Sequence, residues 1–404
     1  MLSHLHNVDL IQQTFPPINT SIYFRALNSM PGSTPLWWAV QNGHVEVVRT
    51  LLARGDVDPN ISNTECGRTP LSLAAMSGSH EGILRMLLDR PDTNPNLADT
   101  KSRTPLELAA HYGHERIVKL LLKRQDTNPN TLNRWFGKTP LGLAAEQGLE
   151  WMVKLLLERG ADPNIHDSRT PLSLAADKGH EGVLRALLKR NEVNPNIADT
   201  GTGATPLWWA AYNANEGVMR ILLKRNDLDP NIPDTIYHTS PLGMAARTGC
   251  VRVVRRLLKR DDIDLNRVYT SRRETALSVA AKHGEEGVVR MLLKRKGINP
   301  NIPNREGETP LWLAIHGISS ISRPHEGIVR LLLERNDINL NIADRRYGQT
   351  PLEYAVSKGY QEIAELLQER ANITSNTGPV SETQPVLPNI SAPSGRPRKM
   401  ARRL

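Results

Sequence analysis

Four histidine–glutamate pairs are the residues of this chain whose types suggest catalysis. An imidazole beside a carboxylate is a pairing that general acid–base catalysis uses, and it occurs at His80-Glu81, His114-Glu115, His180-Glu181 and His325-Glu326. The pairs stand at the same place in a repeated segment, where a first helix ends and an apolar run begins. A glutamate in the first turn of a helix is favoured by the helix dipole. We therefore interpret the pairs as helix-start structure and not as acid–base centres.

The remaining metal- and thiol-type residues lack the spacing that their chemistry requires. His111 and His114 are three residues apart, but Gly113 interrupts the helix that would align them, and a His-Glu-x-x-His sequence is absent. Cys66 and Cys250 are far apart in sequence, which argues against a disulfide scaffold and favours a reducing compartment. We expect no catalytic residue, metal or cofactor.

The composition narrows the class of protein. The 404 residues are 39% hydrophobic and 4% aromatic, with a formal net charge of +9. This excess is too diffuse to form the basic stripe of a nucleic-acid-binding domain. No apolar run approaches the ~20 residues that cross a bilayer, and the N-terminal residues lack the secretory pattern. We expect a cytoplasmic or nuclear protein without membrane contact.

The triplet Thr-Pro-Leu, or a near copy, begins ten times along the chain. It starts at Thr34, Thr69, Thr104, Thr139, Thr170, Thr205, Ser240, Thr275, Thr309 and Thr350. The successive spacings are 35, 35, 35, 31, 35, 35, 35, 34 and 41 residues. Such a period is typical of a solenoid, in which each unit packs only on its neighbours. A solenoid offers a long binding surface, so the sequence favours binding over catalysis.

The fifth unit shows how each repeat is built. Thr170 can cap a helix, Pro171 suits the first helical position, and Gly179 can end the helix in a left-handed conformation. A second helix over residues 181–190 begins with an acidic residue and ends with basic ones, as the dipole favours. Asn194-Pro195-Asn196 ends that helix. The following loop, here called the finger, returns to the next threonine and is counted with the repeat that this threonine begins.

These segments resemble the ankyrin repeat family. TPLSLAA, GHEGVLRALLKR and the Arg-Gly-Ala-Asp-Pro-Asn run at 159–164 are similar to its TPLHLAA motif, its Gly-His and Leu-rich segment, and its Gly-Ala-Asp-Val-Asn segment. The resemblance covers about residues 31–373, and the long fingers are similar to those of arrays in filamentous fungi. It implies an all-α solenoid of paired antiparallel helices with hairpin-like fingers. Such arrays act as non-enzymatic scaffolds that bind proteins through the concave face and finger tips.

One position departs from the family in every repeat. The histidine of TPLHLAA is replaced by Trp37, Ser72, Glu107, Gly142, Ser173, Trp208, Gly243, Ser278, Trp312 and Glu353. The hydrogen bonds that this histidine makes between repeats must therefore be replaced or missing. Two repeats carry a second tryptophan, which we expect to pack in the core. For the first tryptophan, Trp37 or Trp208, packing and a partner-anchoring place on the concave face are equally favoured.

The ends of the array differ from its middle. Gln368 stands where most repeats have leucine, so the tenth repeat is expected to be a cap that faces water. Residues 1–30 lack the motif and are expected to form a degenerate half-repeat or cap. Residues 374–404 contain five prolines and no aromatic residue, so we expect a disordered tail.

The resemblance places partner contacts on the finger tips and on the two residues after each Ala-Ala pair. Tryptophan, tyrosine, phenylalanine and arginine dominate interface energetics and are frequent at these positions. The predicted contact residues are Arg134, Trp135, Phe136, His111, Tyr112, Tyr212, Tyr237, Arg247, Arg272, Arg273, Arg346 and Tyr347, with Trp37 and Trp208. We expect one or more protein partners and a monomeric chain.

The C-terminal tail leaves an alternative function open. Its basic residues are Arg396, Arg398, Lys399, Arg402 and Arg403. The segment at 395–399 resembles an AT-hook core, although Ser394 replaces the arginine that should precede the glycine. It could equally be a nuclear import signal or a solubilising end. The alternatives are a nuclear or chromatin-associated factor that touches nucleic acid only through this tail, and a targeting fragment of a larger enzyme or signalling protein.

Overall fold

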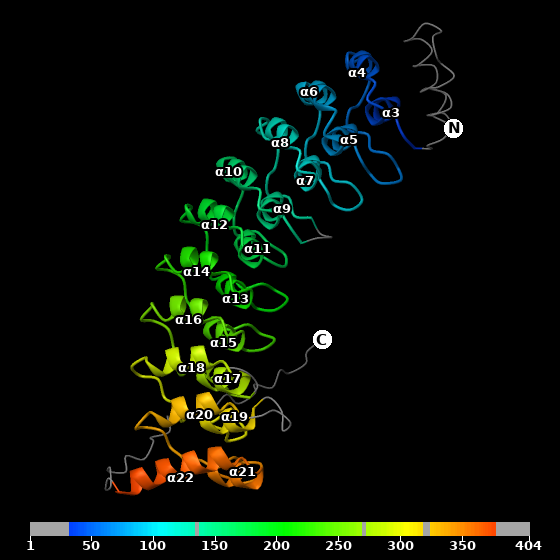
Figure 1. Ribbon diagram of the computed structural model, residues 1–404. Helices are drawn as coiled ribbons and strands as arrows, with labels where there is room; N and C mark the ends of the chain where they lie inside the picture. Colours follow the sequence, from blue (N-terminus) through cyan, green and yellow to red (C-terminus); the bar gives the residue numbers. More distant parts are fainter. Residues whose placement is uncertain (1–31, 134–136, 269–271, 318–323, 377–404) are drawn as a thin grey trace, which may run out of the picture.

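The computed structural model describes residues 32–133, 137–268, 272–317 and 324–376. Within these ranges the chain forms twenty helices and no strand. The helices stack as ten antiparallel pairs in a curved all-α solenoid, with the first helix of each pair and the fingers on the concave side (Figure 1). This is the fold class that the repeat period predicts.

The first helix of each pair is called the inner helix. The inner helices are α3 (Pro35–Gln41), α5 (Pro70–Ser77), α7 (Pro105–His111), α9 (Pro140–Gln147), α11 (Pro171–Lys178), α13 (Pro206–Tyr212), α15 (Pro241–Arg247), α17 (Ala276–His283), α19 (Pro310–His316) and α21 (Pro351–Ser357). Each packs on the inner helices before and after it.

The second helix of each pair, the outer helix, lies on the convex side. The outer helices are α4 (Val45–Leu52), α6 (Glu81–Asp89), α8 (Glu115–Leu121), α10 (Glu150–Glu158), α12 (Glu181–Leu188), α14 (Glu216–Leu222), α16 (Val251–Leu257), α18 (Glu286–Leu293), α20 (Glu326–Leu333) and α22 (Gln361–Asn376). The last of them continues three residues beyond the expected end of the array at Ile373.

Every inner helix begins in the way that the fifth unit predicts. The hydroxyl of the repeat threonine, or of Ser240, accepts a hydrogen bond from the backbone N–H three residues later. Proline follows this cap in all repeats except the eighth, which has Ala276. Because these helices have only seven or eight residues, they are too short to persist alone. Stacking therefore supplies most of their stability.

Inner helices end at a left-handed residue, and the sixth repeat is strained there. Gly179 has φ +80° in the fifth repeat, but the equivalent position of the sixth is Ala214, with φ +54°. We expect Ala214→Gly to raise the free energy of unfolding by about 1 kcal/mol, because left-handed backbone is unfavourable for alanine and easy for glycine. Urea denaturation would measure the change.

Gly179→Ala is the matched control for this prediction. A Cβ added at Gly179 would make only ordinary contacts, with the nearest Asn215 atoms at 3.4 Å. Its cost is therefore one of backbone conformation, and it should destabilise by a similar amount. Two variants with wild-type stability would show that the left-handed turn carries no strain.

Candidate functional site

An asparagine ladder holds the fingers in register along the whole array. In eight segments of the Asn-Pro-Asn type the second asparagine donates from Nδ2 to a backbone carbonyl of the next repeat and accepts at Oδ1 from a backbone N–H of that repeat. Asn60, for example, donates to Asp92 O at 2.8 Å and accepts from Asn94 N at 2.7 Å. The ladder residues are Asn60, Asn96, Asn130, Asn164, Asn196, Asn231, Asn266 and Asn301.

A row of arginines makes the opposite connection, from the ends of most outer helices back to the repeat before. The Arg90 guanidinium donates to the carbonyls of Leu52 at 2.8 Å and Arg54 at 3.0 Å, and it also pairs with Asp92 at 2.5 Å. The Asp92 side chain in turn holds the guanidinium in place, and this hydrogen bond from Arg90 lowers the pKa of Asp92. Most repeat boundaries are thus bonded from both sides, which fixes neighbouring repeats relative to each other.

The histidines of the His-Glu pairs also connect repeats. The Nε2 atoms of His114 and His180 lie 3.0 Å from Met76 O and 2.9 Å from Glu146 O, and His325 Nε2 lies 3.3 Å from Lys282 O. Each of these carbonyls lies near the C-terminal end of the inner helix of the preceding repeat. The structural interpretation of these three histidines is confirmed, because their rings are engaged in inter-repeat hydrogen bonds.

The first tryptophan of each Trp pair does not reach the concave face, and its assignment as a partner anchor is wrong. Trp37 is 5% exposed and Trp208 is 2% exposed. Their indole N–H groups donate to Arg68 O and Thr239 O, both at 2.8 Å, in the next repeat. Trp312 makes the same kind of contact with Gln349 O at 3.4 Å. In these three repeats tryptophan replaces the inter-repeat hydrogen bond that the missing histidine would have made.

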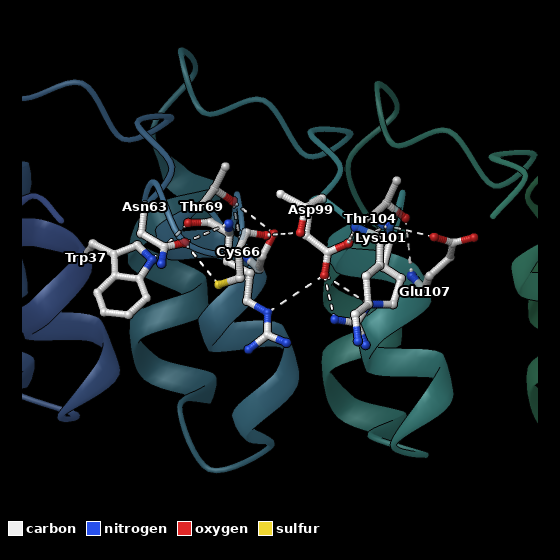
Figure 2. Close-up of polar contacts among 12 residues, drawn as sticks. Trp37, Asn63, Cys66, Thr69, Asp99, Lys101, Thr104 and Glu107 are labelled. Atoms are coloured by element: carbon white, nitrogen blue, oxygen red, sulfur yellow. Dashed lines mark hydrogen bonds and ion pairs between the residues drawn. The ribbon is translucent and has the colours of Figure 1, made fainter. Parts of the chain in front are cut away.

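Glu107 occupies the same position in the third repeat and is a buried carboxyl. It is 1% exposed, and it forms a capping box in which it accepts from the Thr104 backbone N–H at 2.9 Å (Figure 2). Its other oxygen, Oε1, has no hydrogen-bond partner among the described residues. Burial raises the pKa of Glu107 to about 8, although the Thr104 hydrogen bond opposes the shift. Burial therefore favours the protonated form of this carboxyl.

The buried aspartate next to Glu107 behaves differently. Asp99 is buried at the base of the finger, and its carboxylate pairs with Arg103 at 2.7 Å and with Arg68 at 3.7 Å (Figure 2). Burial alone would raise the pKa of Asp99, but the hydrogen bonds from Arg103 outweigh it and the pKa is lowered. The Asp99 carboxylate is thus ion-paired with arginine, whereas burial favours the neutral form of Glu107.

Four predicted tyrosines lie exposed on the concave side. Tyr112, Tyr212, Tyr237 and Tyr347 are 48%, 49%, 50% and 61% exposed. The Arg247 guanidinium lies 5.7 Å from the Tyr237 ring centre, and the Arg346 guanidinium lies 5.1 Å from that of Tyr347. His111 is exposed beside Tyr112, with ring centres 5.1 Å apart. Such exposed aromatic and arginine side chains suit protein recognition.

The Tyr212 ring rests on the buried Trp208 and is held in one place. The two rings are parallel with centres 5.4 Å apart, and Tyr212 meets Trp209 edge to face at 6.0 Å. Trp209, which we expected to pack in the core, packs against it and is partly buried. Its other face carries the Arg169 guanidinium at 3.8 Å. The sixth repeat therefore presents a cluster of packed aromatic rings, of which Tyr212 is the most exposed.

A cleft of about 740 Å³ lies at the C-terminal end of the concave face. It brings together the predicted contact residue Arg272 and two others from more than seventy residues later, Arg346 and Tyr347. Its lining comes from α17, α19, α21 and the adjacent fingers: Arg272, Lys282, Glu306, Glu308, Trp312, Leu313, His316, Asp344, Arg346, Tyr347, Gln349, Tyr354, Ser357 and Lys358.

Aromatic rings form the wall of this cleft. The ring centre of Trp312 lies 4.7 Å from that of Tyr354 and 4.9 Å from that of His316. The Lys358 ammonium lies 5.6 Å from the Tyr354 ring centre. Tyr354 is buried, and burial raises its pKa. Sequence reasoning missed His316 and Tyr354, although His316 follows the position of the second alanine and Tyr354 replaces a repeat leucine.

Acidic and basic side chains both line the cleft, and several of them already have hydrogen-bond or ion-pair partners within the protein. Lys282 pairs with Glu274 at 2.9 Å, and Asp344 accepts three backbone N–H bonds from its own finger. Glu308 accepts from Asn304 at 2.7 Å. Glu306 differs, because its buried Oε2 has no hydrogen-bond partner among the described residues.

The structure does not describe every predicted contact residue. Arg134, Trp135 and Phe136, and the basic tail residues Arg396, Arg398, Lys399, Arg402 and Arg403, lie outside the described residues. Arg273 is exposed, with φ +57°. No helix in the described ranges is both long enough and apolar enough to cross a bilayer.

Comparisons with known proteins agree with this architecture. The crystal structure of the ankyrin repeat domain of Bcl-3, described as a unique member of the IkappaB protein family, has a TM-score of 0.50 and 24% identity over 57% of this chain and 99% of that chain. No curated protein sequence matches the chain. A family model for ankyrin repeats in three copies matches residues 6–99, 84–167, 165–234, 226–304, 242–342 and 296–377. Because these matches span most of the chain, the protein belongs to the ankyrin repeat family.

Proposed function

We propose that the protein is a non-catalytic scaffold that binds a partner protein in the concave cleft of repeats eight to ten. Ankyrin repeats generally mediate protein–protein interactions. The supporting observation is the cleft itself, which joins an aromatic wall to the exposed Tyr347 and to Arg272 and Arg346. The exposed tyrosines of repeats three and six, with Tyr237 on the next finger, extend the surface along the array.

Rigidity supports this role. The asparagine and arginine connections hold each finger in place before a partner arrives. A preorganised surface loses less conformational freedom on binding, so more of the contact energy appears as affinity. The basic side chains at the rim, Arg272, Arg346 and Lys358, favour acidic groups on the partner around a central apolar or aromatic side chain.

Partner binding should depend on the cleft rim. A photo-reactive phenylalanine analogue at position 347, introduced in the native host, would cross-link the partner for identification by mass spectrometry. We expect Tyr347→Ala combined with Arg346→Glu to weaken binding of the cross-linked partner by roughly ten-fold or more, as for a central tyrosine–arginine anchor. Calorimetry with the purified partner would measure it.

Tyr112→Ala is the control, because Tyr112 is similarly exposed but lies seven repeats earlier than Tyr347. It should change the affinity much less. Full binding by the cleft variant, with an unchanged circular dichroism spectrum, would refute the assignment of the cleft. Equal losses in both variants would indicate contact spread along the array.

A further inference from the structure

One position at the C-terminal ends of the outer helices carries a block of lysines. It is the residue immediately before the arginine that follows most of the outer helices. In repeats five to eight this residue is Lys189, Lys224, Lys259 and Lys294, and all four are exposed. In repeats two, four, nine and ten it is acidic: Asp89, Glu158, Glu334 and Glu369. Four consecutive repeats thus carry lysine at this position, and the repeats on either side of them carry glutamate.

Helix stability does not account for these lysines. A basic residue at a helix C-terminus is favoured by the dipole, but that argument applies equally to every repeat. Glu158 and Glu334 stand at the same place in helices that fold in the same way. None of the four lysines forms an ion pair within the described ranges. This position therefore accepts a side chain of either charge. The lysines set the charge of the surface and are not required for the helix to form.

The seventh repeat strengthens the positive charge at the centre of the block. Most outer helices begin with a glutamate that pairs with a basic residue one turn later, as Glu181 does with Arg185 and Glu286 with Arg290 at 2.8 Å. In α16 that glutamate is replaced by Val251. Consequently Arg255 has no ion-pair partner among the described residues.

A second arginine adds to this centre. Arg252 is exposed and stands where α12, α14 and α18 have glycine, and it too lacks an ion pair in the part of the chain that the structure describes. The outer basic block is therefore Lys189, Lys224, Lys259, Lys294, Arg252 and Arg255. The helices that carry it, α12, α14, α16 and α18, pack side by side on the convex side (Figure 1).

We propose that the outer basic block, at the outer helices and not in the concave cleft, binds an extended acidic segment of a second protein. Packed helices lie about 8–10 Å apart, and an extended chain advances about 3.3–3.6 Å per residue. An acidic side chain at roughly every third residue would therefore meet one lysine per repeat. The charges of neighbouring repeats lie within about one screening length of each other and act together.

The surface favours a polypeptide over duplex nucleic acid. Glu181, Glu216 and Glu286 lie in the first turns of three of the same four helices and are 38%, 37% and 51% exposed at the side chain. A duplex carries a negative charge about every 1.7 Å of its axis and would meet these carboxylates. A peptide can place neutral or basic residues opposite them.

Fluorescence anisotropy with the full chain tests this inference. The probe is a labelled 15-residue peptide with glutamate at every third position, and comparison probes are its glutamine counterpart, a 15-base-pair DNA duplex and phosphatidylserine vesicles. We expect the acidic peptide to bind at low salt. The combined variant Lys224→Glu, Lys259→Glu and Lys294→Glu should bind it roughly ten-fold or more weakly, since three attractions become repulsions.

Lys123→Glu is the matched control. Lys123 occupies the same position in the third repeat and is exposed, but it is isolated between Asp89 and Glu158. It should leave the affinity within about two-fold. The basic tail is intact in every variant, so binding that survives the triple substitution would overturn the proposal. Absence of peptide binding, or tighter binding to the duplex or the vesicles, would overturn it as well.

Discussion

Trp208→Ala is expected to lower the free energy of unfolding by about 3–5 kcal/mol, the usual cost of removing a buried aromatic ring. The ring is 2% exposed, supports Tyr212 at 5.4 Å and donates to Thr239 O in the next repeat at 2.8 Å. Its loss leaves both a cavity and an unpaired carbonyl. Hydrogen exchange should show the largest loss of protection in repeats six and seven, because a solenoid unfolds locally.

Two further variants separate packing from hydrogen bonding at this site. Trp208→Phe keeps most of the ring but removes the N–H, so we expect a cost of about 1–3 kcal/mol from the unsatisfied Thr239 carbonyl. Tyr212→Ala removes the half-exposed ring that lies on Trp208 and should cost less than Trp208→Ala. If Trp208→Ala unfolded at the wild-type urea concentration, the ring would not be part of the repeat interface.

Glu107→Gln is expected to stabilise the protein at alkaline pH. The folded carboxyl, with a pKa of about 8, keeps its proton between its ordinary pKa of 4.5 and that value, whereas the unfolded one releases it. The unfolded state therefore binds fewer protons in this window, and stability falls as pH rises through it. At 1.36 kcal/mol per pKa unit, the neutral amide should add roughly 2–5 kcal/mol above pH 8.

Urea denaturation at pH 5 and pH 9 would measure this effect. At pH 5 the wild type and Glu107→Gln should differ little, and at pH 9 the variant should be the more stable. Glu353→Gln is the control, because Glu353 makes the same capping box in the last repeat but is exposed, and the hydrogen bonds from Thr350 lower its pKa. A wild type equally stable at both pH values would show that Glu107 ionises freely.

The repeat motif was sufficient to predict the fold and the local chemistry of each helix. Thr170, Pro171 and Gly179 form the cap, first turn and left-handed end that their residue types favour. These features depend on neighbours in sequence, and a single repeat reveals them. The exposed positions of Tyr112, Tyr212, Tyr237 and Tyr347 followed from the family resemblance, and they agree with the structure. Whether they bind a partner is still a prediction.

Features that join repeats were harder to predict. The Asn-Pro-Asn segment was interpreted as a helix end and loop, yet the Asn60 side chain bonds to a repeat more than thirty residues away. Trp208 could have faced either way, because its direction depends on the position of Thr239 O. The cleft needs residues from three repeats at once, so no single motif indicates that Trp312, His316 and Tyr354 share a wall with Arg272.

The connections between repeats end mostly on the main chain. Asn60 and its counterparts bond to backbone groups, as do the arginines and the three histidines. Every repeat offers those groups whatever its side chains, so a newly copied unit finds its bonds on either side without compensating mutations. An array built in this way can lengthen or shorten through tandem gene duplication and deletion, while its exposed side chains diverge independently.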